Sequence, residues 1–298
     1  MRHRDQIPSR IRHKLSRARG SATSTPTFLL RLDTDTTRDT DSTRPILDLL
    51  DDTQIKATFM VATGPDDSPR NILGARTRII RGRYHKRYGL KTLKQTLKPE
   101  QHLETRIEAR EILRGGHEIA LHGHWHTRWI KEAHKWNPTQ AQDRVTRAFT
   151  SFTSHFGFQP KGFSAPGFTT TPYVTQALQN HPLLYTSNTR NPRPHRPTLR
   201  GHPVRHLEMP ANTNNLEERI LHGASPNSAK EAVIREAAET LRKEEYLCYY
   251  THPSFDAHLH RDLLPRLINT IQQQEPRTPT METAARERRT HGEDTPDL

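Results

Sequence analysis

The sequence contains a single cysteine, Cys248, in 298 residues. An internal disulfide bond and a zinc site built from several cysteines are therefore excluded. No segment approaches the roughly 18 consecutive apolar residues that a membrane-spanning helix needs. The basic residues 1–20 are not followed by the apolar region of a signal peptide. Together these absences predict a cytoplasmic protein.

The chain is also poor in apolar and acidic residues. Apolar residues make up 31% of it, and 46 Lys and Arg against 33 Asp and Glu give a net charge of +13. Residues 1–26 and 276–298 are nearly devoid of apolar runs, so we expect a basic disordered tail and a polar disordered tail. The remaining residues, 27–275, are predicted to form one domain.

Within residues 27–275, short apolar runs alternate with segments of helical periodicity. The runs predicted to be strands are residues 27–33, 56–63, 117–122, 161–165, 183–187, 204–209 and 246–251. Strands that alternate with helices in this way are typical of βαβ units in a parallel sheet. We predict the α/β class, with a distorted (β/α) barrel of about seven parallel strands.

Ionisable residues follow three of these predicted strands. Asp33 and Asp35 end the first, His122 and His126 follow the third, and His252 follows the last. Because the carboxyl ends of parallel strands line one face, we expect these side chains to converge. One aspartate and two histidines suit a catalytic metal site with a position open for water. The other aspartate would then lie beside that water as a base.

Each element of this pattern has a simpler interpretation. A DxD sequence at a strand end is also common in turns and helix caps. With 19 histidines, a pair four residues apart is expected by chance, and His124 lies within the same cluster. A lone histidine such as His252 is more often structural than catalytic. The coincidence of all these residues at three strand ends favours the metal site.

The order of DxD, HxxxH, an APG turn and a late TH resembles the polysaccharide deacetylase (NodB-homology) superfamily. Within it, LLRLDTDT and VATGPDD are most similar to the 4-deoxy-4-formamido-L-arabinose-phosphoundecaprenol deformylases. The likeness extends over residues 27–275 and includes GGHEIALHGHWH, FSAPGF, LYTSNTR and YYTHPSFD.

The resemblance implies a barrel with one divalent metal ion at its mouth. Zinc is the first expectation, with cobalt, manganese or nickel as alternatives. The roles that it implies are general base for Asp33, metal ligands for Asp35, His122 and His126, general acid for His252, and pocket wall and oxyanion contact for Ala165, Pro166 and Gly167.

Two positions depart from the family pattern. Many members carry an arginine at the start of the FSAPGF segment, where it holds the base aspartate, and this chain has Ser164 there. The formyl-sugar subgroup also lacks that arginine. The subgroup has an acidic residue where this chain has Asn188, a position implied to contact the substrate or to tune the acid histidine.

We therefore expect a hydrolase of linear amides that removes the N-formyl group of a 4-formamido-4-deoxy-arabinose linked to polyprenyl phosphate, in lipid A modification. The enzymatic alternative is an N-deacetylase of another lipid-linked amino sugar or of a cell-wall polysaccharide. A third alternative is an inactive homologue that binds membrane or glycan. It is disfavoured because all five ionisable residues of the site are present.

Residues 69–99 contain ten Lys or Arg and no Asp or Glu, with apolar residues between them. Such a segment suits an anionic membrane surface, and Arg78, Arg81 and Arg83 are its candidate contacts to lipid or phosphate. The alternatives are a solvated basic face and nucleic-acid binding, and the latter is disfavoured because no nucleic-acid-binding motif is present. We expect the protein at the inner face of the cytoplasmic membrane.

Replacing Arg78, Arg81 and Arg83 together by Glu should weaken co-sedimentation with anionic vesicles, since each basic residue near lipid contributes about 1 kcal/mol. Hydrolysis of a soluble short-chain substrate analogue should be unaffected. Vesicle binding equal to that of the unmodified protein would contradict the membrane interpretation.

Overall fold

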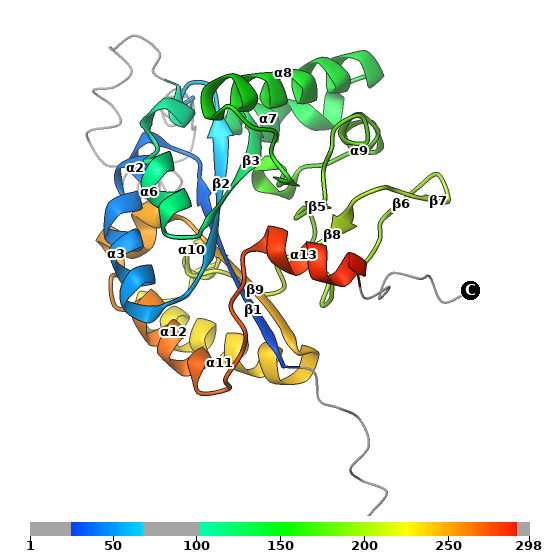
Figure 1. Ribbon diagram of the computed structural model, residues 1–298. Helices are drawn as coiled ribbons and strands as arrows, with labels where there is room; N and C mark the ends of the chain where they lie inside the picture. Colours follow the sequence, from blue (N-terminus) through cyan, green and yellow to red (C-terminus); the bar gives the residue numbers. More distant parts are fainter. Residues whose placement is uncertain (1–24, 68–101, 291–298) are drawn as a thin grey trace, which may run out of the picture.

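The computed structural model describes residues 25–67 and 102–290 (Figure 1). Its main sheet has seven parallel strands in the order β8-β5-β4-β3-β2-β1-β9 and curls into a partial barrel. The predicted α/β barrel is confirmed. The strands are β1 (Thr27–Thr34), β2 (Ala57–Thr63), β3 (Glu118–His124), β4 (Gly162–Phe163), β5 (Tyr185–Thr186), β8 (Leu207–Glu208) and β9 (Tyr246–Thr251).

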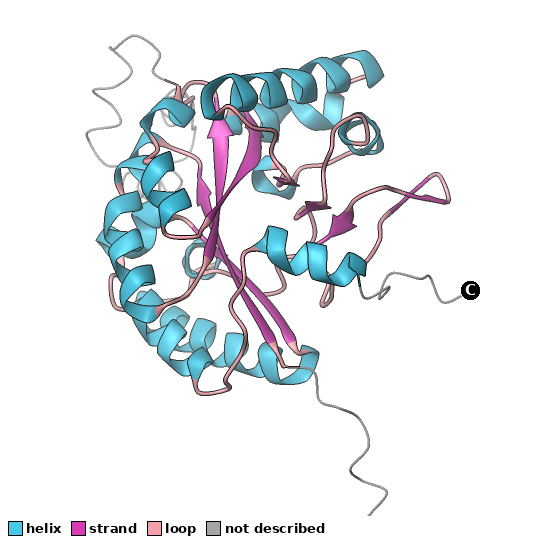
Figure 2. Ribbon diagram, viewed as in Figure 1, coloured by secondary structure: helices cyan, strands magenta, loops and turns pink. Residues whose placement is uncertain are grey.

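Helices cover the outer, convex side of the sheet (Figure 2). They are α2 (Thr37–Asp41), α3 (Thr43–Thr53), α6 (Ala109–Arg114), α7 (His126–Glu132), α8 (Pro138–Phe156), α9 (Pro172–Leu178), α10 (Leu216–Leu221), α11 (Pro226–Glu244) and α12 (Leu263–Gln272). The last helix, α13 (Met281–Thr290), lies on the inner side instead. A 3₁₀ turn, Leu103–Arg106, precedes α6. A small antiparallel hairpin, β6 (Thr198–Leu199) and β7 (His202–Pro203), lies outside the sheet.

The four long strands, β1, β2, β3 and β9, are buried along their whole length. Alternate residues of β1 separate into two groups. Phe28, Leu30 and Leu32 pack with the outer helices, whereas Leu29 belongs to the cluster inside the barrel. Because side chains alternate along a strand, Arg31 and Asp33 face the interior with Leu29. This places polar groups of β1 inside the barrel near its carboxyl end.

Asn212 links the two edge strands of the sheet, β8 and β9. Asn212 follows β8, and its Oδ1 accepts a hydrogen bond from Cys248 N–H at 2.9 Å. Its own backbone N–H and its Nδ2 donate to the carbonyls of Cys248 and Tyr246, at 3.3 and 3.0 Å. The side chain of Asn212 thus occupies bonding positions that a neighbouring strand would fill on β9.

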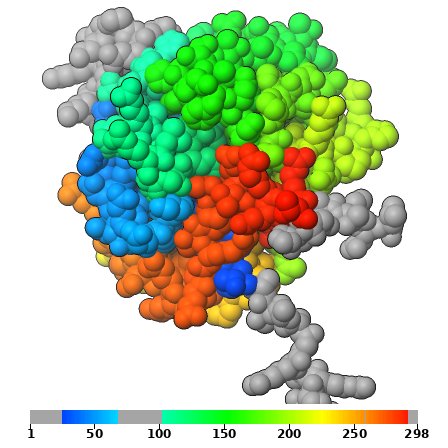
Figure 3. All heavy atoms as spheres, viewed as in Figure 1, coloured from blue at the N-terminus to red at the C-terminus, as the bar shows by residue number. Residues whose placement is uncertain are grey.

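The prediction of a disordered tail from residue 276 is wrong for residues 276–290. Arg277 forms a parallel bridge with Thr27, and α13 then lies across the face of the molecule (Figure 3). Met281, Ala284 and Ala285 are fully buried in the cluster inside the barrel. Three small or flexible apolar residues at helical spacing were too weak a signal to predict a buried helix.

Glu118, at the amino end of β3, holds α13 in place from inside the barrel. Its carboxylate accepts hydrogen bonds from Tyr185 OH, Thr58 OH and Glu282 N–H, each at 2.8 Å. Burial raises the pKa of Glu118 to about 7, although these hydrogen bonds act in the opposite direction. The folded state therefore retains a proton on Glu118 at pH values where the unfolded chain has lost it.

Because the pKa of Glu118 is higher in the folded than in the unfolded state, its contribution to the free energy of unfolding is fully present below the pKa of the unfolded chain. This contribution is lost as the pH rises through about 7. Relative to the unmodified protein, Glu118→Gln should become more stable by about 2–3 kcal/mol between pH 5 and pH 8. Urea unfolding at the two pH values measures this difference. Glu239→Gln, at an exposed position of α11, is the control and should show no such trend. A pH-independent difference for Glu118→Gln would contradict the account.

Candidate active site

Asp35, His122 and His126 come together at the carboxyl end of the sheet, and one ligand atom from each lies within 4.8 Å of the others. His122 Nε2 is 3.3 Å from Asp35 Oδ1, and His126 Nε2 is 3.2 Å from Asp35 Oδ2. All three side chains are buried or nearly so. The predicted ligands therefore form one cluster, contributed by the loop after β1, the end of β3 and the start of α7.

A bulge in β3 excludes His124 from this cluster. Val61 of β2 pairs with Leu121, but Thr63 pairs with His124, so β3 has one extra residue over this interval. An extra residue reverses the alternation of side chains beyond it. His124 accordingly stacks on Trp125 and bonds to the hydroxyl of Thr63 at 3.0 Å. Burial lowers the pKa of His124 to about 4.

Gly123, within the bulge, has φ of +66°, and a Cβ there would lie 2.7 Å from the ring of Pro166. This close approach brings Ser164 against His122. The Nδ1 of His122 lies 3.1 Å from the carbonyl oxygen of Ser164 and 2.5 Å from its Oγ. A backbone carbonyl only accepts, so Nδ1 carries the proton and Nε2 presents its lone pair to the cluster.

This donor set fits a divalent metal ion. One carboxylate and two imidazoles are the ligand types that zinc and similar ions take in catalytic sites. The tautomer of His122 is already the one that a ligand needs. Burial by itself would raise the pKa of Asp35, but the neighbouring imidazoles of His126 and His252 hold it well below its usual range. Asp35 is therefore an anion at neutral pH.

The two aspartates of the GPDD sequence hold the loops that carry the ligands. Asp66 accepts hydrogen bonds from the backbone N–H and hydroxyl of Thr37, at 2.9 and 3.1 Å, two residues after Asp35. Asp67 accepts from the backbone N–H groups of Thr127 and Arg128, at 2.9 and 2.7 Å. These N–H groups belong to the first turn of α7, which begins at the predicted ligand His126.

Asp33 lies beside the cluster, with its Oδ2 3.8 Å from His122 Nε2. Its two oxygens accept from Nε and Nη2 of Arg31, each at 2.7 Å. Arg31 is fully buried. Sequence reasoning did not assign Arg31 a role, although its spacing of two from Asp33 already indicated the same face of the strand.

His252 lies on another side of Asp35, with 3.0 Å between its Nε2 and Asp35 Oδ2. Its Nδ1 is 2.9 Å from Oε2 of Glu217, the second residue of α10. Glu217 was missed because it follows no strand and belongs to no recognised motif. His252 therefore lies between two carboxylates, with Asp35 at Nε2 and Glu217 at Nδ1.

The turn Ala165–Gly167 and Asn188 also meet, but in a way that the sequence did not suggest. The backbone N–H of Ala165 donates to Asn188 Oδ1 at 2.7 Å. This N–H is engaged within the protein, so it is not the donor that an oxyanion would use. The roles of Pro166, Gly167 and Asn188 toward a substrate stay predictions.

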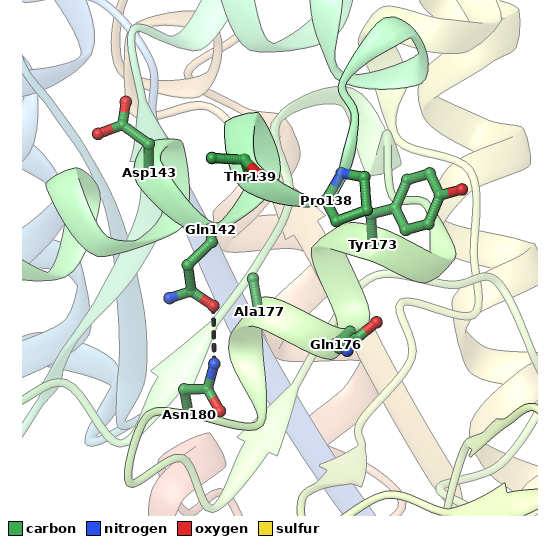
Figure 4. A pocket seen from close by; sticks show the side chains of 8 residues that line it. All are labelled: Pro138, Thr139, Gln142, Asp143, Tyr173, Gln176, Ala177 and Asn180. Atoms are coloured by element: carbon green, nitrogen blue, oxygen red, sulfur yellow. Dashed lines mark hydrogen bonds between the residues drawn. The ribbon is translucent and has the colours of Figure 1, made fainter.

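A second feature of the surface lies away from this site. A hollow between α8 and α9 is lined by uncharged residues and Asp143, and contains none of the predicted site residues (Figure 4). Arg78, Arg81 and Arg83 lie outside the described residues. In the part of the chain that the structure describes, no helix has both the length and the apolar character to span a bilayer.

The mouth of the curled parallel sheet thus holds a candidate metal site, with a second aspartate and a further histidine beside it. Residues 20–186, more than half of the chain, match the family model described as polysaccharide deacetylase. The chain belongs to this family, which is generally metal-dependent.

Similar folds are found in solved structures of low sequence identity. A protein from Mycobacterium smegmatis described as a polysaccharide deacetylase has a TM-score of 0.65 at 16% identity, over 93% of this chain and 95% of that one. The Xyl-CE4 domain of a multidomain xylanase from the hindgut metagenome of Trinervitermes trinervoides has a TM-score of 0.50 at 13% identity, over 90% of this chain and 92% of that one. A protein from Bacillus anthracis described as a CE4 family pseudoenzyme has a TM-score of 0.50 at 10% identity, over 88% of this chain and 66% of that one.

The cluster predicts that neighbouring histidines differ in metal binding. His126→Ala should weaken zinc affinity by more than about 100-fold, because it removes one of three protein ligands. His124→Ala is the matched control and should leave zinc affinity unchanged. Titration with a competing chelator measures both, after circular dichroism has confirmed folding. Equal losses in the two variants would remove His126 from the ligand set.

Proposed function

We propose that this protein is a metal-dependent amidohydrolase that removes the N-formyl group of an amino sugar carried on a polyprenyl phosphate. The observation that supports hydrolysis most directly is the placement of Asp33 and His252 around the Asp35–His122–His126 cluster. A carboxylate and an imidazole are thus available to accept and to donate protons at one centre.

A divalent ion held by Asp35, His122 and His126 would supply a Lewis acid and lower the pKa of water there. Asp33, whose Oδ2 lies 3.8 Å from His122 Nε2, accepts a proton from the water molecule whose oxygen attacks the formyl carbon. His252, protonated, donates to the sugar nitrogen, because an amide nitrogen leaves poorly as an anion. Glu217 faces Nδ1 of His252 and stabilises its positive charge.

In the balanced reaction, water and the formamido group of the sugar give formate and the free amine of the sugar. It needs no covalent intermediate. Burial raises the pKa of the Cys248 thiol to about 12, so this cysteine remains protonated at neutral pH and is a poor nucleophile.

Three features support the formyl-sugar assignment over a general glycan substrate. The segments LRLDTDT and VATGPDD carry the likeness to that subgroup, and the second supplies the two aspartates that hold the ligand loops. Ser164 stands where many deacetylases have arginine. The basic residues 69–99 suit the phosphate of a lipid carrier at the inner face of the cytoplasmic membrane. Zinc is the proposed ion, with cobalt, manganese and nickel as alternatives.

An N-deacetylase is the second candidate, and Asn188 is the observation that favours it. Its side chain bonds to Ala165 N–H where the subgroup has an acidic residue. Mass spectrometry after incubation of zinc-loaded protein with polyprenyl-phosphate-linked 4-formamido-arabinose, beside the N-acetyl counterpart, tests both. We expect loss of formyl alone. Loss of acetyl alone would identify the protein as an N-deacetylase. If neither the N-formyl nor the N-acetyl substrate were hydrolysed, the proposed substrate would be contradicted.

Asp33→Asn should retain the metal but lower kcat by about 10²–10⁴-fold, because an amide cannot accept the proton of the attacking water. Metal content and steady-state rates measure the two effects separately. A rate within a few-fold of the unmodified enzyme would remove Asp33 as the base.

A further inference from the structure

We propose that Arg31 is the positioning residue for the base Asp33, and that strand β1 thereby supplies the guanidinium that many family members place at position 164. This inference rests on the proposed function and deepens it. It follows from the contacts of Arg31, which is fully buried inside the barrel two residues before Asp33.

The guanidinium of Arg31 is fixed on three sides. Its Nε and Nη2 donate to the two oxygens of Asp33, each at 2.7 Å. Its Nη1 donates to the carbonyl oxygen and the Oγ of Ser187, at 2.8 and 3.0 Å. The rings of Phe168 and Tyr250 lie 5.1 and 5.6 Å from its central carbon. A planar group with these contacts cannot rotate without breaking several of them at once.

A bidentate pair fixes the plane of a carboxylate as well as its position. Each oxygen of Asp33 has two lone pairs and gives one to Arg31. The others remain available to the centre, where Oδ2 lies 3.8 Å from His122 Nε2. Arg31 therefore aims the base at the water to be deprotonated, without itself touching the reacting atoms.

Position 164 has a different task in this chain. Both the carbonyl and the hydroxyl of Ser164 face Nδ1 of the ligand His122. The serine thus orients a metal ligand, and the orientation of Asp33 comes from Arg31. Ser164 and Arg31 thus divide these two tasks between them.

Arg31→Lys keeps the charge but not the fork that grips both oxygens. We expect kcat to fall by at least about 100-fold while KM and zinc affinity change by less than about threefold, since only the base loses its orientation. Arg190→Lys is the matched control. Arg190 stacks on the same rings of Phe168 and Tyr250, at 4.4 and 4.7 Å, but has no contact with Asp33. Its kcat should stay within about tenfold.

Added guanidinium chloride at millimolar concentration should restore part of the activity of Arg31→Ala but not of Asp33→Asn.

A second measurement does not need activity. The urea midpoints of Arg31→Met, Asp33→Asn and the double variant are compared. Arg31→Met should unfold at a lower urea concentration, and adding Asp33→Asn should restore most of that decrease, because no buried carboxylate is then left unpaired.

A kcat for Arg31→Lys within tenfold of the unmodified enzyme, or an equal loss in Arg190→Lys, would overturn the proposal. Additive unfolding midpoints would also overturn it, and this result can be obtained even if Arg31→Ala does not fold. An unmodified enzyme inactive on both formyl and acetyl substrates would contradict the proposed function instead, and the unfolding cycle would still decide whether Arg31 holds Asp33.

Discussion

A buried carboxylate is stable only where opposite charges and hydrogen-bond donors compensate it. Asp35 is such a group, nearly inaccessible to solvent and surrounded by the imidazoles of His122, His126 and His252 within 3.3 Å. These side chains come from β3, α7 and the end of β9, so the first, third and last long strands must end at the same place. The GPDD loop, the bulge at Gly123 and the contact of α10 with His252 all serve this meeting point.

Much of this arrangement was accessible from the sequence. The alternation of apolar runs and helices predicted the parallel barrel, and polar residues at strand ends predicted which side chains would meet. The residues alone did not decide between His124 and His126, although the resemblance implied His126, because the choice depends on a bulge that only pairing with β2 creates. Glu217 was equally hidden, since tertiary packing alone brings α10 to His252. The burial of α13 was not predicted either, because only three of its residues, Met281, Ala284 and Ala285, are buried apolar ones in a segment rich in charged residues.

Fold alone does not decide activity in this family. One similar structure, from Bacillus anthracis, is described as a pseudoenzyme. In this chain the ligand cluster, a carboxylate held by arginine, and a histidine paired with a carboxylate are all assembled at one centre. Each is a buried polar arrangement that costs stability unless its partners are complete, and their joint presence is the physical argument for a working enzyme.

In the proposed enzyme Asp35, His122 and His126 hold the metal, while Asp33 and His252 transfer protons. Diffraction at the zinc absorption edge, from crystals grown with zinc, tests this claim most directly. The account predicts one anomalous peak whose protein ligands are Asp35, His122 and His126. A peak ligated by Asp33 or His252, or one located elsewhere in the molecule, would contradict it.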